Sequence, residues 1–154
     1  MTPAPDDYIA TLNTLNEIGR KITSSLSVEV INDTVYENVN SLMDATGFGI
    51  GFFDPERNRL VFPGYIERGE RLAEAAYPLD DHNRVAVKCF NNNHEIVIND
   101  FDKEISLHVE RPPVPAVGEQ TQSIIYLPLK TRDRTIGVIT VQSFKKKAYS
   151  EYDL

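Results

Sequence analysis

The chain has 154 residues, 41% of them hydrophobic and 25% charged, which suits about one globular domain and excludes a disordered segment. A net charge of −7 without a clustered basic face excludes a basic nucleic-acid-binding domain, and a single cysteine excludes an intrachain disulfide and favours a reducing compartment. No apolar run approaches the roughly 18 residues of a membrane span, so we expect a cytoplasmic domain without a membrane segment or a nucleic-acid partner.

The first 26 residues predict an amphipathic helix, because apolar residues recur at spacings of three and four from about residue 7 to 25. The stripe consists of Ile9, Leu12, Leu15, Ile18, Ile22 and Leu26. It is narrow, so this helix either packs on its own domain or dimerises and transmits a signal. A second helix is expected from Ser27, which suits an N-cap, to Gly47, which can end it. We therefore assign residues 1–26 to an N-terminal helix and residues 27–154 to the domain proper.

After residue 47 the period changes to two, which predicts a sheet. Strands are expected at 48–53, 60–66, 96–98, 123–130 and 135–144, with hairpin turns at 54–58 and 131–134. A short helix at 72–76 and a helix at 83–90, capped by Asp80 or Asp81, are also expected. Residues 102–122 carry prolines and no periodicity, which is typical of a lid or binding loop. The order predicts the α+β class, an antiparallel sheet with helices largely on one face.

The most specific pattern is at the C-terminal end. Residues 123–130 read Ser-Ile-Ile-Tyr-Leu-Pro-Leu-Lys, residues 136–143 read Ile-Gly-Val-Ile-Thr-Val-Gln-Ser, and residues 149–153 read Tyr-Ser-Glu-Tyr-Asp. Two earlier segments match in order, Thr-Gly-Phe-Gly-Ile-Gly-Phe-Phe-Asp at 46–54 and Ile-Val-Ile-Asn-Asp at 96–100. From about residue 15 onward the sequence resembles a GAF domain, a small-molecule sensing module of signalling proteins. A PAS domain, the nearest alternative, would not normally open with two long helices and end in this hairpin.

The resemblance implies an antiparallel sheet of about six strands, with the N- and C-terminal helices on one face. It places a ligand pocket on the other face, covered by segments between about residues 67 and 90 and by the loop before residue 123. It also implies a homodimer through the terminal helices and a covalently linked output domain such as a histidine kinase. The last residues start like a helix, so we expect a C-terminal helix that is truncated here.

The implied function is a sensory or regulatory domain of a larger signalling protein, which binds a small molecule and passes a conformational bias to the output domain. One alternative is a dimerisation module of the same fold with no ligand. A remote alternative is a thiol-based redox enzyme.

Strand alternation supplies candidate ligand-binding residues, on the assumption that Gly49 and Gly51 face the helices. The candidates from the strands are Phe48, Ile50, Phe52, Tyr126, Val138, Thr140 and Gln142. The same set could also be a second core with no guest. Asp100 follows a strand that the family places beside the pocket, where it either accepts hydrogen bonds from a ligand or caps the next loop.

Enzymatic chemistry is not expected. Cys89 is followed by Phe90 rather than by the histidine typical of tetrapyrrole-binding relatives, and the family's free methionine sulfoxide reductases need a second cysteine. The histidines, His82, His94 and His108, lie far apart along the chain, so no metal site is expected. No glycine-rich phosphate loop is present. We therefore predict a regulatory domain with no catalytic residues, no metal and no tetrapyrrole.

Overall fold

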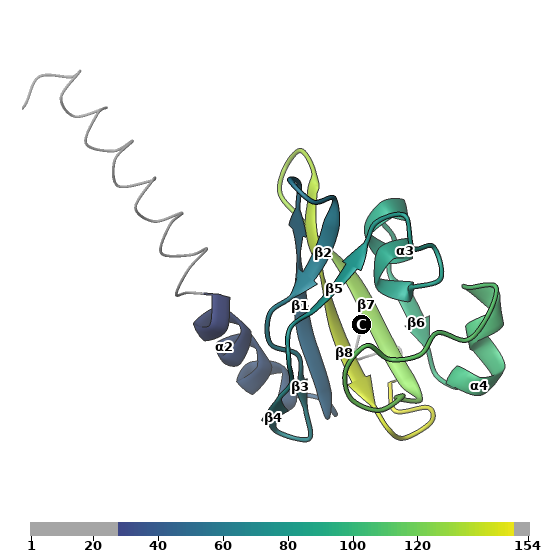
Figure 1. Ribbon diagram of the computed structural model, residues 1–154. Helices are drawn as coiled ribbons and strands as arrows, with labels where there is room; N and C mark the ends of the chain where they lie inside the picture. The colour runs from purple at the N-terminus through teal and green to yellow at the C-terminus, as the bar shows by residue number, and fades with distance from the viewer. Residues whose placement is uncertain (1–27, 150–154) are drawn as a thin grey trace, which may run out of the picture.

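The computed structural model describes residues 28–149 (Figure 1). The sheet has eight antiparallel strands in the order β4-β3-β1-β8-β7-β6, and β2 pairs with β1 and β5. The strands are β1 (Gly47–Asp54), β2 (Arg59–Phe62), β3 (Ile66–Glu67), β4 (Glu70–Arg71), β5 (Ala75–Pro78), β6 (Ile96–Ile98), β7 (Ser123–Lys130) and β8 (Thr135–Ser143). The helices are α2 (Val28–Asn40), α3 (Val85–Asn92), α4 (Phe101–Glu104) and the 3-10 turn η2 (Ile105–Leu107).

The α+β class and the antiparallel sheet are confirmed, with more strands than expected because the segment after β2 adds three short ones. The helix expected at residues 7–25, the cap at Ser27 and the C-terminal helix start lie outside the described residues. Within residues 28–149, no helix is long and apolar enough to cross a membrane.

Both faces of the sheet are covered, with α2 on one side and α3, α4 and the loop after η2 on the other (Figure 1). On the α2 side, Phe48, Ile125 and Val141 are buried, and Val35 and Tyr36 of α2 pack against this cluster. On the α3 side, the buried cluster consists of Leu60, Phe62, Ala86, Val87, Cys89 and Val138. The sheet is therefore covered on both faces, and α3 makes a second apolar layer with strands β2 and β8.

The prediction for the two faces of β1 is wrong. Phe48 pairs with Val141 and Ile50 with Ile139, and paired residues share a face of the sheet. Phe48 and Ile50 therefore belong to the α2-side cluster, and Phe52 packs against it. None of these three side chains faces the α3 side.

The glycines of β1 face the α3 side because two aromatic rings lie against them. A Cβ on Gly51 would be 2.6 Å from Cζ of Phe62, and one on Gly49 would be 2.8 Å from Cδ2 of Tyr65. The glycines thus make room for rings rather than for a helix. Close approach of a helix and close approach of aromatic rings both favour alternating glycines. The glycine pattern alone therefore does not indicate which face of β1 is turned toward the helices.

The segment after β2 is extended rather than helical, so the helix expected at 72–76 is wrong. Arg68 and Gly69 have φ of 52° and 80° and turn the chain between β3 and β4. Ala75 then pairs with Phe62 in the β2–β5 ladder. This pairing satisfies backbone groups that a helix would have satisfied internally, so tertiary contact overrides the helix propensity of the alanines.

Helix α3 starts later than expected, and neither predicted aspartate caps it. Its N-cap is Arg84, which makes no side-chain cap hydrogen bond. The Asp81 carboxylate instead accepts from the backbone N–H of Asn83 at 3.2 Å, in the turn before the helix. The helix ends at Asn93, whose φ of 55° is the left-handed conformation that asparagine tolerates.

Asp44 joins the end of α2 to the sheet. Its carboxylate accepts hydrogen bonds from the Ser143 hydroxyl at 2.7 Å and from the Thr46 backbone N–H at 3.1 Å. Its backbone carbonyl accepts from the Tyr149 hydroxyl at 2.7 Å. Burial alone would raise the pKa of Asp44, but the hydrogen bonds from Thr46 and Ser143 and the charge of Lys145 hold it below 3.8.

Asp44→Asn is expected to lower the free energy of unfolding by about 1 kcal/mol at neutral pH, because the amide replaces a charged acceptor. A folded-state pKa below the unfolded value gives stability that is present above pH 3.8 and lost as the pH falls through the folded value. Urea unfolding should therefore show a difference in the free energy of unfolding between the wild type and Asp44→Asn at pH 6, and this difference should become smaller below pH 3.8. Asp133→Asn, an exposed turn position, is the matched control. A gap that widens on acidification would contradict the assignment.

Candidate functional site

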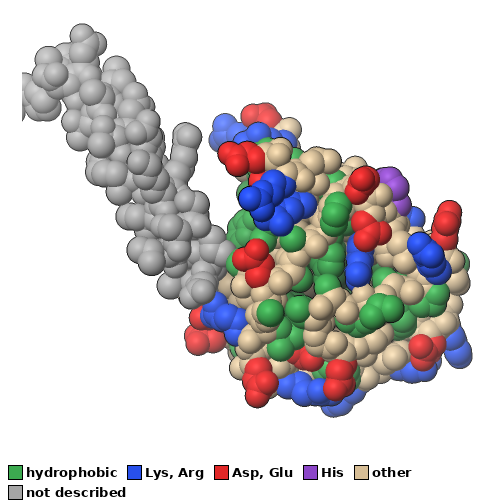
Figure 2. Space-filling view, in the orientation of Figure 1, with side chains coloured by type: hydrophobic (Ala, Val, Ile, Leu, Met, Phe, Trp, Pro, Cys, Tyr) green, Lys and Arg blue, Asp and Glu red, His purple; other side chains and the backbone are tan. Residues whose placement is uncertain are grey.

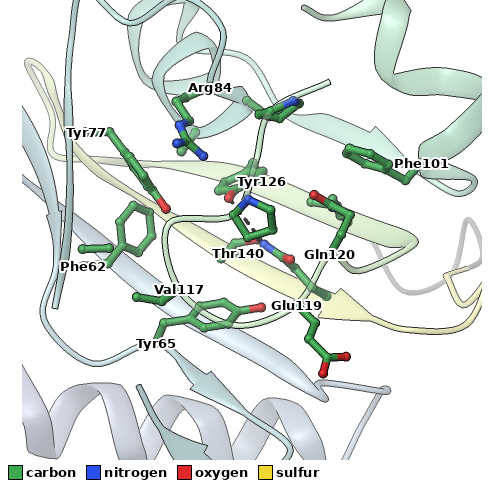
Figure 3. A pocket seen from close by; sticks show the side chains of 17 residues that line it. Phe62, Tyr65, Tyr77, Arg84, Phe101, Val117, Glu119, Gln120, Tyr126 and Thr140 are labelled. Carbon is green, nitrogen blue, oxygen red and sulfur yellow. Dashed lines mark hydrogen bonds between the residues drawn. The ribbon is translucent and has the colours of Figure 1, made fainter. Parts of the chain in front are cut away.

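A cavity of about 90 Å³ lies on the α3 side of the sheet. Its floor comes from β2, β7 and β8, one wall from the start of α3, and its roof from residues 113–120 (Figure 3). Figure 3 shows the Tyr126 ring at the centre, with Tyr77, Phe62 and Tyr65 along one side and Phe101 on the other. The lining is therefore largely apolar, with five aromatic side chains and a few polar groups, which is the usual composition of a small-molecule site.

The structure brings together three of the predicted site residues, Tyr126, Thr140 and Gln142, which all line the cavity. Val138 is on the same face but is fully buried under α3 with Leu60 and does not line the cavity. Phe48, Ile50 and Phe52 lie on the opposite face, so their placement at the pocket is corrected.

Asp100 also lies away from the cavity lining, and it caps a helix. Its side chain accepts from the backbone N–H of Lys103 at 3.4 Å, at the start of α4. It also forms an ion pair with Lys146 at 3.4 Å. The capping alternative is therefore the one that the structure shows.

Several lining residues were missed by the sequence analysis. These are Phe62, Tyr65, Ala75, Tyr77, Arg84, Val85, Ala86, Phe101, Pro113, Pro115, Val117, Glu119, Gln120 and Ile124. Ile124 could have been found, because it alternates with Tyr126 along β7. The others come from β2 and the segment after it, from the start of α3, from α4 and from the lid, whose positions depend on long-range contacts.

A chain of hydrogen bonds crosses the floor of the cavity. The Thr140 hydroxyl donates to the Ile125 carbonyl at 2.8 Å and accepts from Nε2 of Gln142 at 3.0 Å. The same Nε2 donates to the Tyr126 hydroxyl oxygen at 3.4 Å. The Thr121 hydroxyl donates to Oε1 of Gln142 at 2.5 Å. Thr121 ends the loop above the cavity, so this chain connects the loop to the sheet.

Burial keeps the tyrosine hydroxyls protonated. Burial raises the pKa of Tyr65, and the neighbouring groups Tyr126 and Glu67 raise it further. Burial also raises the pKa of Tyr126, and that of Tyr77 in spite of the nearby Arg84 charge. These hydroxyls therefore act at neutral pH as hydrogen-bond donors and acceptors and carry no charge.

The loop of residues 108–122, called the lid from here on, is held at its first half by α3 and the turn before it. Nη1 of Arg84 donates to the Val114 carbonyl at 2.6 Å. The backbone N–H of Arg111 donates to Oδ1 of Asn83 at 3.2 Å. The Arg84 guanidinium also lies over the Tyr77 ring, 4.8 Å from its centroid. Arg84 thus joins the lid to the aromatic wall of the cavity.

The second half of the lid is held by the buried carboxylate of Glu67 on β3. The backbone N–H of Glu119 donates to Oε1 of Glu67 at 3.2 Å. Gly118, at a φ of 69°, approaches so closely that a Cβ there would be 2.5 Å from that oxygen. The glycine therefore allows the lid to close onto the carboxylate.

Cys89 is inaccessible and its thiol is unreactive. It is fully buried on α3 against β2 and β8, and burial raises its pKa to about 12. Among residues 28–149, no group of three or more His, Cys, Asp or Glu side chains could hold a metal ion. On the face seen in Figure 2, acidic and basic side chains are interspersed rather than gathered by sign.

The comparisons with known proteins identify the family. The model of the GAF domain matches residues 25–154. A comparison with curated protein sequences found no match. Among solved structures, the GAF domain of an Acinetobacter phosphoenolpyruvate-protein phosphotransferase is 18% identical with a TM-score of 0.60. The aligned region covers 94% of this chain and 83% of that one.

Two other solved structures are similar in fold. One is free methionine-R-sulfoxide reductase from Neisseria meningitidis, with 18% identity, a TM-score of 0.63 and coverage of 99% of this chain and 84% of that chain. Another covers residues 122 to 287 of a methyl-accepting chemotaxis protein, with 20% identity, a TM-score of 0.61 and coverage of 92% and 86%. At such identities these likenesses show the fold alone, whereas the family model spans most of the sequence. The chain therefore belongs to the GAF domain family, a family of regulatory and sensory domains.

Proposed function

We propose that this domain binds a small molecule in the cavity beneath the lid and passes a conformational bias to an output domain such as a histidine kinase in the cytoplasm. The observation that carries the proposal is the cavity itself, which holds three tyrosine side chains under a lid. The hydroxyl of Tyr126 is bonded to Gln142 and lies beside Thr140, and those of Tyr65 and Tyr77 donate to no residue among those described. A bound molecule that accepts from these hydroxyls would add hydrogen bonds to the site.

Strand β8 supplies a route from the cavity to the other face of the sheet. Gln142 lines the cavity and is bonded to Thr121 of the lid. The next residue, Ser143, donates to Asp44 in the turn that follows α2. A ligand that favours one lid position would therefore favour one position of β8, and this strand is hydrogen-bonded to the turn after α2 on the other face. We propose that the terminal helices form a homodimer interface, through which the conformational change would reach the partner subunit. Sedimentation velocity of the whole chain measures whether it is a dimer.

A second function, a dimerisation module without a ligand, is favoured by the small size of the cavity. Its volume of about 90 Å³ is below the ~300–1,000 Å³ of typical ligand sites. The redox-enzyme alternative is disfavoured by the burial of Cys89 and the high pKa of its thiol. A binding experiment on the cavity distinguishes a small-molecule sensor from a dimerisation module without a ligand.

Ala75→Leu is expected to prevent binding, because Ala75 lines the cavity and three added carbons would fill it. The protein is incubated with a small-molecule cell extract, and its mass is then measured under native and denaturing conditions. A non-covalent added mass is expected on the wild type and on the control Ala76→Leu, whose position does not line the cavity. We expect about tenfold less added mass on Ala75→Leu, because the larger side chain occupies the space that the bound molecule needs. Equal added mass on both variants would contradict binding in this cavity, and no added mass on the wild type would favour the module.

A further inference from the structure

We infer that the ligand of this cavity is a compact molecule that presents oxygen acceptors, in a carbonyl or carboxylate group, on a short apolar body. The inference rests on the proposed function and specifies the chemistry of the same site. It follows from the direction of the hydrogen bonds on the cavity floor, from the unused donors around it and from its size.

A backbone carbonyl fixes the direction of the hydrogen bonds. The Ile125 carbonyl can only accept, so Thr140 must donate to it. The Thr140 oxygen therefore accepts from Gln142, which orients the Gln142 amide with its NH₂ toward Thr140 and Tyr126. The Gln142 oxygen faces Thr121, whose hydroxyl donates to it.

This direction makes Tyr126 a donor to the cavity. Its oxygen accepts from Gln142, so its own hydrogen is left for another partner. The Thr140 hydroxyl lies beside it but already donates to Ile125 and accepts from Gln142. Tyr126 lies at the centre of the site, where a guest offers its hydrogen a further acceptor (Figure 3). Tyr65 and Tyr77 add two further hydroxyls without a described acceptor. The apolar side chains around these hydroxyls offer no acceptor, so a guest that accepts from them gains hydrogen bonds that a purely apolar guest does not.

The charge near the donors also disfavours a cationic guest. Arg84 lines the cavity, and only part of its five-donor guanidinium is used, on Val114 and, at 3.6 Å, on Asp81. The opposing carboxylate, Glu119, is at the exposed rim and forms an ion pair with Arg68 at 3.3 Å. An ammonium group at the centre would be repelled by the positive charge of Arg84. A carbonyl or carboxylate oxygen there would accept from Arg84 and from the hydroxyls.

Size and lining limit the rest of the molecule. A cavity of roughly 150 Å³ holds benzene, so one of about 90 Å³ holds a group of a few carbon atoms while the lid is closed. Phe62, Val85 and Ile124 supply apolar walls for such a group. A nucleotide or a tetrapyrrole does not fit these dimensions without opening of the lid.

The test compares three probes of similar length, propionate, propionamide and propylammonium, by titration into ¹⁵N-labelled protein. Saturable shifts of lid and β8 amides are expected with propionate or propionamide, and at least about tenfold weaker binding with propylammonium. Whichever oxygen probe binds more tightly distinguishes the carboxylate from the neutral carbonyl. Tyr126→Phe removes one hydroxyl and is expected to weaken binding about tenfold, since a hydrogen bond of this kind contributes ~1.4 kcal/mol. Tyr36→Phe, on the α2 side of the sheet, is the matched control and is expected to leave binding unchanged.

Propylammonium binding equal to that of the oxygen probes would overturn the inference, as would unchanged affinity in a folded Tyr126→Phe variant. No binding of any probe would overturn it as well. In that case an added mass from the cell extract, lost in Ala75→Leu, would leave the proposed function standing with a different ligand chemistry. Retention of the wild-type amide spectrum by Tyr126→Phe shows that a loss of affinity is not a loss of fold.

Discussion

Phe48→Ala is expected to lower the free energy of unfolding by about 4 kcal/mol. Phe48 is fully buried, and its ring is 5.7 Å from that of Tyr36, which is on α2. Its pairing partner Val141 belongs to the same cluster. Removing the ring leaves a void between the sheet and the helix that neither rigid element can fill. Urea unfolding followed by circular dichroism measures the change.

The control for this prediction is Phe52→Ala. Phe52 is on the same face but only partly buried, near the end of β1, so a loss of about 2 kcal/mol is expected there. The folded fraction of Phe48→Ala should keep its affinity for cavity ligands, because the side chain is on the other face. A stable Phe48→Ala protein that no longer binds would contradict the assignment of the faces of β1.

The C-terminal strands β7 and β8 could be predicted because their side chains alternate between the two faces of the sheet and both faces are occupied. The predicted bounds of β6 and β7 agree with the structure, and the faces assigned to Tyr126, Thr140 and Gln142 were right. In these strands each side chain has one compatible face, so the period fixes the orientation. The same reasoning failed for β1, where glycine alternates with Phe48 and Ile50. A glycine shows that something approaches closely, but it does not show from which face.

The rest of the cavity depends on contacts between segments far apart in the sequence. Tyr65 reaches the site because the chain bends at Pro63 and Gly64 between β2 and β3, and its ring then lies over Gly49. The lid is held by hydrogen bonds to Glu67, Asn83 and Arg84, which lie between 28 and 52 residues away from their partners along the chain. Such contacts leave no local period, so periodicity predicted only a loop there, and the expectation that it covers the pocket came from the resemblance to GAF domains.

Gly137→Ala is expected to lower the free energy of unfolding by about 3 kcal/mol, with a fall in Tm on the order of 10 °C. A Cβ at this position would be 2.1 Å from the carbonyl oxygen of Gly51 and 3.2 Å from its carbon. These are backbone atoms of β1, so no side chain can rotate away. Strand β8 also cannot retreat, because Leu129 of β7 pairs with Gly137 on its other side. Relief therefore requires separating the central strands β1 and β8.

Gly69→Ala is the matched control for this substitution. Its φ of 80° disfavours alanine, but a Cβ there would meet nothing within 4 Å, so only backbone strain of about 1 kcal/mol is expected. Thermal unfolding of the two variants separates steric overlap inside the sheet from strain in a turn. A Gly137→Ala protein as stable as Gly69→Ala would mean that β1 and β8 can move apart at little cost. Because Gln142 and Ser143 are on β8, such mobility would itself change how a ligand in the cavity is coupled to α2.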